Sequence, residues 1–139
     1  MDLAHPWRTL RALAHITVTW CELPHGYRAL TDGRSRIWMH KRLLQRERRA
    51  SLQHELEHIR AGHVGCQPPR TEAKIRFDAA MALLPDLDQV LDELVFYSGD
   101  MEAAAVDLWV DAATVAARLD PAYTHPAEKA RIRERLEGE

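Results

Sequence analysis

His54-Glu55-Leu56-Glu57-His58 is the stretch of this 139-residue chain that says most about its fold and chemistry. It matches the pattern H-E-x-x-H, in which two histidines hold a zinc ion and a glutamate activates a water molecule. A helix advances about 100° per residue, so histidines four positions apart point in similar directions and can bind one ion. A pattern this short would also arise in about one shuffled chain in thirty, so the surrounding sequence has to support it.

Each residue type in the motif suits a catalytic zinc site. A catalytic zinc keeps three protein ligands, and the pKa of the water molecule in its fourth position falls to about 7. A carboxylate that does not bind the ion is needed to take a proton from this water and pass it to the leaving amine. We therefore predict His54 and His58 as zinc ligands and Glu55 as the general base. The competing interpretation is an exposed polar helix face on which two histidines happen to align.

The predicted motif helix has an apolar face opposite its histidines. Leu52, Leu56 and Ile59 recur at spacings of four and three, which is typical of a helix that packs on a core. The polar run 45–49 predicts exposed first turns, and Gly62 predicts the C-terminal end. This helix should therefore lie between a core and a cleft.

Four residues beyond the motif could supply the third ligand, namely His63, Cys66, Glu72 and Asp78. We expect Glu72, because it begins a second predicted helix that ends at Pro85. The apolar positions of that helix are Ala73, Phe77, Ala80 and Leu84, at spacings of four, three and four. The turn 65–69 would fold this helix back antiparallel and bring Glu72 near His58. The alternative for Glu72 is an ordinary acid in a first helical turn, favoured by the helix dipole.

His63 invites comparison with the longer pattern H-E-x-x-H-x-x-G-x-x-H, in which a third histidine completes the site. Here the glycine, Gly62, falls one position late, and His63 falls one position early. These offsets disfavour that arrangement. We interpret His63 as a helix-end residue or a group that supports a ligand, and Cys66 as a small buried or loop residue.

The motif at 54–58, followed by the pattern E-A-x-x-x-F-x-x-x-x-x-L-L-P at 72–85, resembles the ImmA/IrrE family of small zinc metallopeptidases. The resemblance covers roughly residues 37–119 and implies one Zn²⁺ held by His54, His58 and Glu72, with Glu55 as general base. It also implies a cytoplasmic protein of a phage, mobile element or stress system that cleaves or regulates a partner transcriptional repressor. Departures from the family pattern at Glu57, Lys74 and Asp78 remove no ligand.

The segment before the motif predicts a short helix near Pro6-Trp7 and a small antiparallel sheet of three strands. Apolar residues alternate with polar ones over 16–21, and the Asp-Gly pair in 31–34 predicts a hairpin between strands 27–30 and 36–40. We expect 36–40 to be an edge strand that aligns an extended substrate beside the motif helix. The alternative is that this strand only supports the core.

Two histidines of the first third, His25 and His40, could donate hydrogen bonds to a transition state, although lone histidines are usually structural. Residues 1–60 contain eleven Lys and Arg against six Asp and Glu, with Arg46, Arg48 and Arg49 clustered beside the motif. This excess could guide an acidic partner, but we favour composition as its explanation.

The last third of the chain predicts helices, including a pair at 101–109 and 112–119 that resembles a helix-turn-helix. Between Asp86 and Asp120, nine acidic residues stand against one basic residue, Arg118, which is the wrong sign for binding phosphates. We therefore interpret the pair as a packing or partner-docking unit and expect no nucleic-acid partner. The tail 126–139 predicts a charged terminal helix.

The composition indicates one α+β domain covering 1–139, with 46% hydrophobic residues and a net charge of −2. We expect a zincin-like arrangement with a helix and small sheet in 1–44, the motif helix and the Glu72 helix in 45–85, and a helical cluster in 86–139. Two cysteines, no secretory segment and no apolar run of 18 residues favour the cytosol and no membrane partner. The expected activity is endopeptidase cleavage of a protein. The alternatives are a non-catalytic regulator that docks a repressor and, ranked last, a DNA-binding protein.

Overall fold

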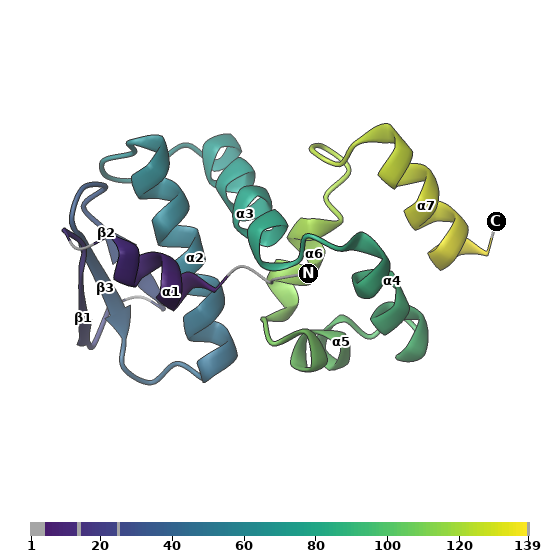
Figure 1. Ribbon diagram of the computed structural model, residues 1–139, viewed down its shortest axis with the longest axis horizontal. Coiled ribbons are helices and arrows are strands. Elements are labelled where there is room, and N and C mark those ends of the chain that lie inside the picture. The colour runs from purple at the N-terminus through teal and green to yellow at the C-terminus, as the bar shows by residue number, and fades with distance from the viewer. Residues whose placement is uncertain (1–4, 14, 25, 139) are drawn as a thin grey trace.

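The computed structural model describes residues 5–13, 15–24 and 26–138. Within these ranges seven helices accompany one sheet of three strands, so the predicted α+β class is confirmed. The sheet and the first three helices lie at one end of the molecule, and the last four helices lie at the other end (Figure 1). None of the helices in the described ranges combines the length and apolar character that crossing a membrane requires.

The first half of the chain forms α1 (Pro6–Ala12), β1 (Thr17–Cys21), β2 (Ala29–Thr31), β3 (Arg36–His40), α2 (Gln45–Ala61) and α3 (Pro69–Leu83). The second half forms α4 (Leu87–Phe96), α5 (Met101–Leu108), α6 (Ala112–Arg118) and α7 (Pro126–Glu137). Three acids of the second half, Asp86, Asp100 and Asp111, accept hydrogen bonds from backbone N–H groups at the starts of α4, α5 and α6. Part of the acidic excess of this region therefore serves as helix caps.

The sheet has the strand order β1-β3-β2 and is mixed, which corrects the antiparallel sheet expected from the sequence. β2 and β3 form the predicted antiparallel hairpin, whereas β1 runs parallel to β3. A hairpin is encoded locally by its turn residues. The direction of β1 depends instead on the placement of β3 between β1 and β2 in the sheet. No local sequence pattern predicts that placement.

β3 is the central strand, and the expectation of an edge strand at 36–40 was wrong. Ile37 and Met39 of β3 have no exposed surface and pack with Leu52 and Leu56 of α2. A strand that buries such residues is best placed with a neighbour on both sides. β1 and β2 are therefore the edges of the sheet, and β2 is the edge that packs against α2.

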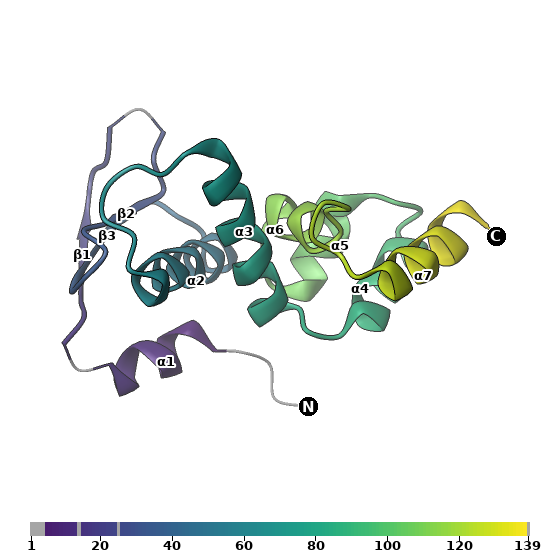
Figure 2. The same ribbon diagram turned by 90° about the horizontal axis from the view of Figure 1, so that it is seen from above.

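Two clusters of buried apolar residues make up the interior. The sheet core consists of Ile16, Ala29, Ile37, Met39, Leu52 and Leu56. The helical core consists of Ala50, Leu83, Leu84, Val90, Leu94, Ala104, Ala105, Leu108, Val110 and Val115. α2 contributes to both, so it links the two ends of the molecule, and Figure 2 shows it between the sheet and the other helices.

The first turns of α2 are not the exposed polar run predicted for 45–49. Arg49 is buried and donates to the carbonyl oxygen of Trp109 at 3.0 Å. Arg46 donates to the carbonyl oxygen of Val110 at 2.9 Å and pairs with Glu102 at 2.6 Å. Carbonyl groups at a helix end lack intrahelical partners and attract cations, so these two arginines fasten the end of α5 to α2.

Candidate metal centre

α2 presents His54 and His58 on the side opposite its apolar face. Leu52 and Leu56 turn toward the sheet core, as predicted, and this fixes the direction of the histidines one turn apart. His58 is almost fully buried, with 7% of its side chain exposed, and His54 is exposed to 23%. The helix ends as predicted at Gly62, which adopts a left-handed conformation with φ of 75°.

α3 folds back against α2 and brings Glu72 to the two histidines, as the sequence predicted. The Oε2 atom of Glu72 lies 3.2 Å from Nε2 of His54 and 3.1 Å from Nε2 of His58. The two Nε2 atoms are 3.2 Å apart. Three potential ligand atoms therefore form a nearly equilateral triangle at the start of the cleft between the helices, and this group could hold a metal ion.

The spacing of these three atoms fits a tetrahedral zinc ion. Bonds of about 2.0–2.1 Å in tetrahedral directions separate the ligand atoms by about 3.3 Å. Hydrogen bonds alone account less well for this triangle. If both Nε2 atoms carried a proton and donated it to the same oxygen of Glu72, the two protons would lie close to each other. Two imidazoles and one carboxylate are also a known ligand set of catalytic zinc sites.

The Nε2 atoms of His54 and His58 both face Glu72, where a metal ion could bind. Burial and then the neighbouring His58 lower the pKa of His54, which favours the neutral imidazole that binds metals. The other ring nitrogen of His58, Nδ1, lies 3.1 Å from Nδ1 of His63. If Nε2 of His58 binds an ion, its Nδ1–H is the donor in this hydrogen bond, and His63 orients the ring.

The loop that carries His63 rests on the hairpin turn between β2 and β3. A Cβ atom at Gly33 would lie 1.8 Å from the carbonyl oxygen of His63, so only glycine fits this close approach. Gly33 also has a φ of 77°, a conformation that other residues adopt at a cost. The turn predicted from the Asp-Gly pair therefore supports the loop behind His58.

Glu55 lies next to the triangle without being part of it. Its residue is 7% exposed, and burial followed by the charge of Glu72 raises its pKa to about 8. Its side chain lines a pocket of about 310 Å³ that also contains His54. A carboxyl group in this position suits proton transfer, because its pKa lies near neutral pH.

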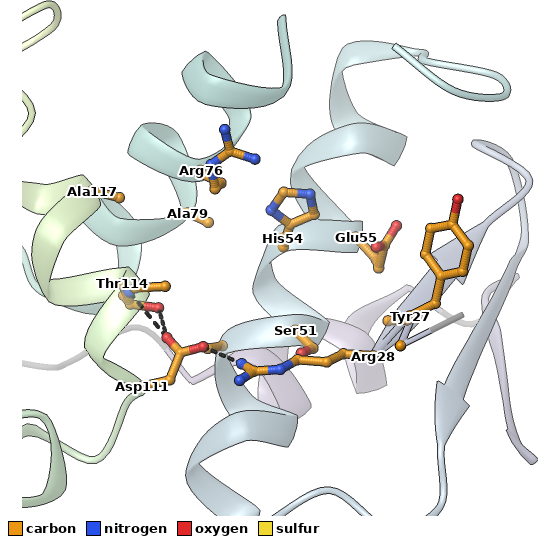
Figure 3. A pocket seen from close by; sticks show the side chains of 14 residues that line it. Tyr27, Arg28, Ser51, His54, Glu55, Arg76, Ala79, Asp111, Thr114 and Ala117 are labelled. Carbon is orange, nitrogen blue, oxygen red and sulfur yellow. Dashed lines mark hydrogen bonds and ion pairs between the residues drawn. The ribbon is translucent and has the colours of Figure 1, made fainter. Parts of the chain in front are cut away.

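The pocket lies between β2, α2, α3 and α6. Tyr27, Arg28 and Ala29 line it from the β2 side, and Arg76 and Thr114 line it from the helices opposite (Figure 3). Together they make a cleft that leads to Glu55 and His54 from one side.

Asp111 lies at the bottom of this view, where Arg28 pairs with it (Figure 3). Asp111 also accepts a hydrogen bond from the backbone N–H of Thr114 at 3.0 Å, and Arg28 makes a second ion pair with Glu47 at 3.2 Å. Arg28 and Asp111 are 83 residues apart in the chain, so their pairing closes the pocket between the two halves of the molecule.

The other residues weighed from the sequence lie away from the triangle. Asp78 pairs with Lys74, and Cys66 is exposed in the loop between α2 and α3. His40 accepts a hydrogen bond from the backbone N–H of Arg42 and lies 3.8 Å from Glu22, and it does not line the pocket that contains Glu55. His25 lies outside the described residues.

Sequence reasoning missed several residues that line the pocket, chiefly Arg28, Arg76, Asp111 and Thr114. One signal was available for Arg76, because it follows Glu72 by four positions and must share its helix face. No local pattern indicated that Asp111, in the turn between two predicted helices, would reach the pocket. Its position depends on how α6 packs against α3.

The helical pair predicted in the last third is present as α5 and α6, but α6 is engaged inside the protein. It packs against α3, and its Val115 and Arg118 have no exposed surface. Arg118 donates to the carbonyl oxygen of Leu84 and pairs with Glu128. A recognition helix has to project a face into the groove of DNA, so this arrangement favours the interpretation of a packing unit.

No family model, curated protein or solved structure matches this chain.

Proposed function

We propose that this chain is a zinc-dependent endopeptidase of the ImmA/IrrE type that cleaves a cytoplasmic protein. The observation that carries the proposal is the triangle of Nε2 of His54, Nε2 of His58 and Oε2 of Glu72, with sides of 3.1 to 3.2 Å, beside the buried Glu55. The choice of a partner transcriptional repressor as substrate rests on the family resemblance of the motif segments alone.

His54, His58 and Glu72 would hold the ion through the three atoms that converge. When bound, zinc supplies a Lewis acid that polarises the scissile carbonyl and lowers the pKa of a water molecule, and its positive charge favours the carboxylate form of Glu55. Glu55 accepts the proton of the attacking water on a carboxylate oxygen and passes it to the departing amide nitrogen. Its burial keeps this proton transfer away from bulk solvent.

β2 gives this proposal a way to position an extended substrate. It is an edge strand beside α2, and the residues that lead into it line the pocket next to Glu55. An edge strand has unpaired backbone groups that can bond a peptide main chain in the manner of an added strand. We therefore assign to β2 the alignment of an extended substrate, which the sequence had suggested for 36–40.

The proposal is tested first by the zinc content of gently purified protein, measured by elemental mass spectrometry. About one equivalent of zinc is expected in the wild type, with a clear loss in Glu72→Ala. Glu102→Ala is the matched control, because Glu102 pairs with Arg46 far from the triangle and should leave zinc unchanged. Absence of zinc from the wild type, even after zinc is added, would overturn the proposal.

A further inference from the structure

Arg76 is a charged residue in the pocket that has no assigned role. It follows Glu72 by one helical turn on α3, and its guanidinium extends from α3 toward the space in front of His54 (Figure 3). Among the described residues, neither a hydrogen bond nor an ion pair holds its side chain, although Glu72 is an acid at the favourable spacing for a helical ion pair.

Glu55, the buried acid of this pocket, is assigned to proton transfer, and the charged side chains opposite it are paired with each other. Asp111 is paired with Arg28 and bonded by the backbone of Thr114, and Arg28 is shared with Glu47. Glu72 is directed to the two histidines. Among the described residues that line the pocket, Arg76 is therefore the cation left available to an entering molecule.

Small residues make up part of the pocket lining. The alanines that line the pocket are Ala29, Ala50, Ala79, Ala113 and Ala117. With only methyl groups on these walls, the volume of about 310 Å³ exceeds that of a single large side chain. The pocket thus offers room for a side chain and a cation that reaches into it.

We propose that this pocket is a subsite for a substrate residue adjacent to the scissile bond, and that Arg76 makes it select an acidic side chain. This inference rests on the proposed peptidase function and adds a substrate class to it. A guanidinium binds a carboxylate through two parallel hydrogen bonds, a geometry that a neutral amide or an aliphatic side chain cannot match. A lysine or arginine in the same place would meet a like charge and be rejected.

The test uses the zinc-loaded full chain and three hydroxamate inhibitors that differ only in the side chain next to the metal-binding group. The side chains are those of glutamate, glutamine and lysine. Isothermal titration calorimetry measures their affinities without requiring turnover. The glutamate form should bind about tenfold more tightly than the glutamine form, because a charge-assisted bidentate pair outweighs a neutral hydrogen bond. The lysine form should bind most weakly.

Variants at Arg76 sharpen this test. In Arg76→Gln the preference for the glutamate form should fall below twofold, and in Arg76→Glu the lysine form should become the tightest. Arg70→Glu is the matched control, because Arg70 lies on the same helix but does not line the pocket, and it should keep the wild-type order. Thermal unfolding of each variant checks that the exposed substitution leaves the fold intact.

The outcomes separate this inference from the proposed function. Zinc bound at one equivalent with equal affinities for the three inhibitors would overturn the acidic subsite and leave the metal centre standing. An Arg76→Glu variant that still prefers the glutamate inhibitor would also overturn the acidic subsite and leave the metal centre standing. A wild-type chain that binds no zinc would overturn both. Digestion of a synthetic peptide mixture, read by mass spectrometry, should show acidic residues enriched at one position beside the cleaved bond, and no enrichment there would count against the subsite.

Discussion

In α2, six buried residues are polar or charged, whereas only three of the other described residues share that property. The six are Arg49, Ser51, Gln53, Glu55, Glu57 and His58. The helical core at the other end of the molecule consists of aliphatic residues alone. Buried polar groups cost free energy unless they are well paired, and aliphatic burial stabilises. α2 therefore holds most of the buried polar groups of the described residues, including those of the candidate site, and depends on its neighbours for stability.

The pairing of the α2 groups is incomplete, which supports this reading. Gln53 donates to Glu57 at 3.0 Å, and Arg60 approaches Glu57 at 3.4 Å, yet the Oε1 atom of Gln53 has no partner among the described residues. A helix that served only to stabilise the fold would have apolar residues at these buried positions. The same helix is held at its start by Arg46 and Arg49, which reach carbonyl groups of the helical end.

The largest effect is expected from Glu55→Gln, which removes the proton acceptor while keeping the shape of the side chain. Cleavage of a peptide mixture, followed by mass spectrometry, should slow by about 10³-fold, within the range that general base catalysis supplies. Zinc content and thermal stability should be preserved, since Glu55 is not one of the three residues that could hold the ion and glutamine has the same shape.

Glu57→Gln is the matched control for this variant, because Glu57 is equally buried in the same motif but contacts Gln53 and Arg60 instead of the pocket. It should retain most of the activity. Equal rates in wild type and Glu55→Gln would contradict the mechanism. Full biological function in a Glu55→Gln protein that no longer cleaves would favour the alternative, a regulator that docks without cutting.

At the helical end, Leu94→Ala should lower the free energy of unfolding by about 2–5 kcal/mol, as expected for a buried leucine replaced by alanine. Leu94 is 1% exposed in the helical core. Urea denaturation measures the loss, and the folded variant should still bind one equivalent of zinc.

Phe96→Ala tests the same helix without touching the core, since Phe96 is 77% exposed. Its stability should change by at most about 0.5 kcal/mol. Loss of zinc from folded Leu94→Ala would show that the helical core and the candidate metal site are not independent. Equal stability of Leu94→Ala and Phe96→Ala would show that the helical core does not provide the expected stability.

A comparison of two glycines distinguishes local strain from support of the site. Gly33→Ala and Gly99→Ala both place alanine at positive φ, a cost of roughly 1 kcal/mol each. Only at Gly33 would the new methyl group meet the backbone of His63, whereas nothing lies within 4 Å at Gly99. Gly33→Ala should therefore be less stable by about a further 1 kcal/mol and bind zinc about tenfold more weakly.

Thermal unfolding and competition with a chromogenic zinc chelator measure these two quantities for the glycine variants. Equal zinc affinities in Gly33→Ala and Gly99→Ala would show that the hairpin turn does not support His58 through His63.

The smallest effect concerns Asp32, the exposed acid of the same turn. Backbone N–H groups, with Arg36 the strongest contributor, then Arg34 and Ser35, lower its pKa to about 2. The unfolded value is about 3.9, so the stabilisation is complete above about pH 4 and disappears as pH falls toward 2. The difference in melting temperature between wild type and Asp32→Ala should shrink over that window.

Asp32→Asn keeps a hydrogen-bond acceptor at this position but has no carboxyl group to titrate, so its difference from Asp32→Ala should stay constant with pH. A melting difference between wild type and Asp32→Ala that is the same at pH 6 and at pH 2.5 would contradict the role of the carboxylate.

Several features of the candidate site follow from local patterns and could be predicted from the sequence. The spacing of His54 and His58 set their common direction, and Leu52 and Leu56 set the opposite face of the helix. Pro85 and the loop at 65–69 indicated a second helix folding back, which brings Glu72 within 3.2 Å of both histidines. Each of these inferences involves residues separated by a few helical turns.

The features that were predicted wrongly depend on contacts between distant parts of the chain. The direction of β1 and the central place of β3 follow from how the strands share the sheet core. The burial of Arg49 follows from the position of Trp109, 60 residues later. A polar run in sequence is exposed by default, and only a partner elsewhere in the fold can change that.

The sequence by itself determined the α+β class, the helices that carry the site and the three residues that converge there, because helical periodicity and turn residues act over short distances. Only the tertiary structure decided what surrounds those atoms. The pairing of Arg28 with Asp111 across 83 residues and the packing of α6 on α3 create the pocket and leave Arg76 facing it. Such contacts are chosen by the packing of the whole chain, and no local pattern encodes them.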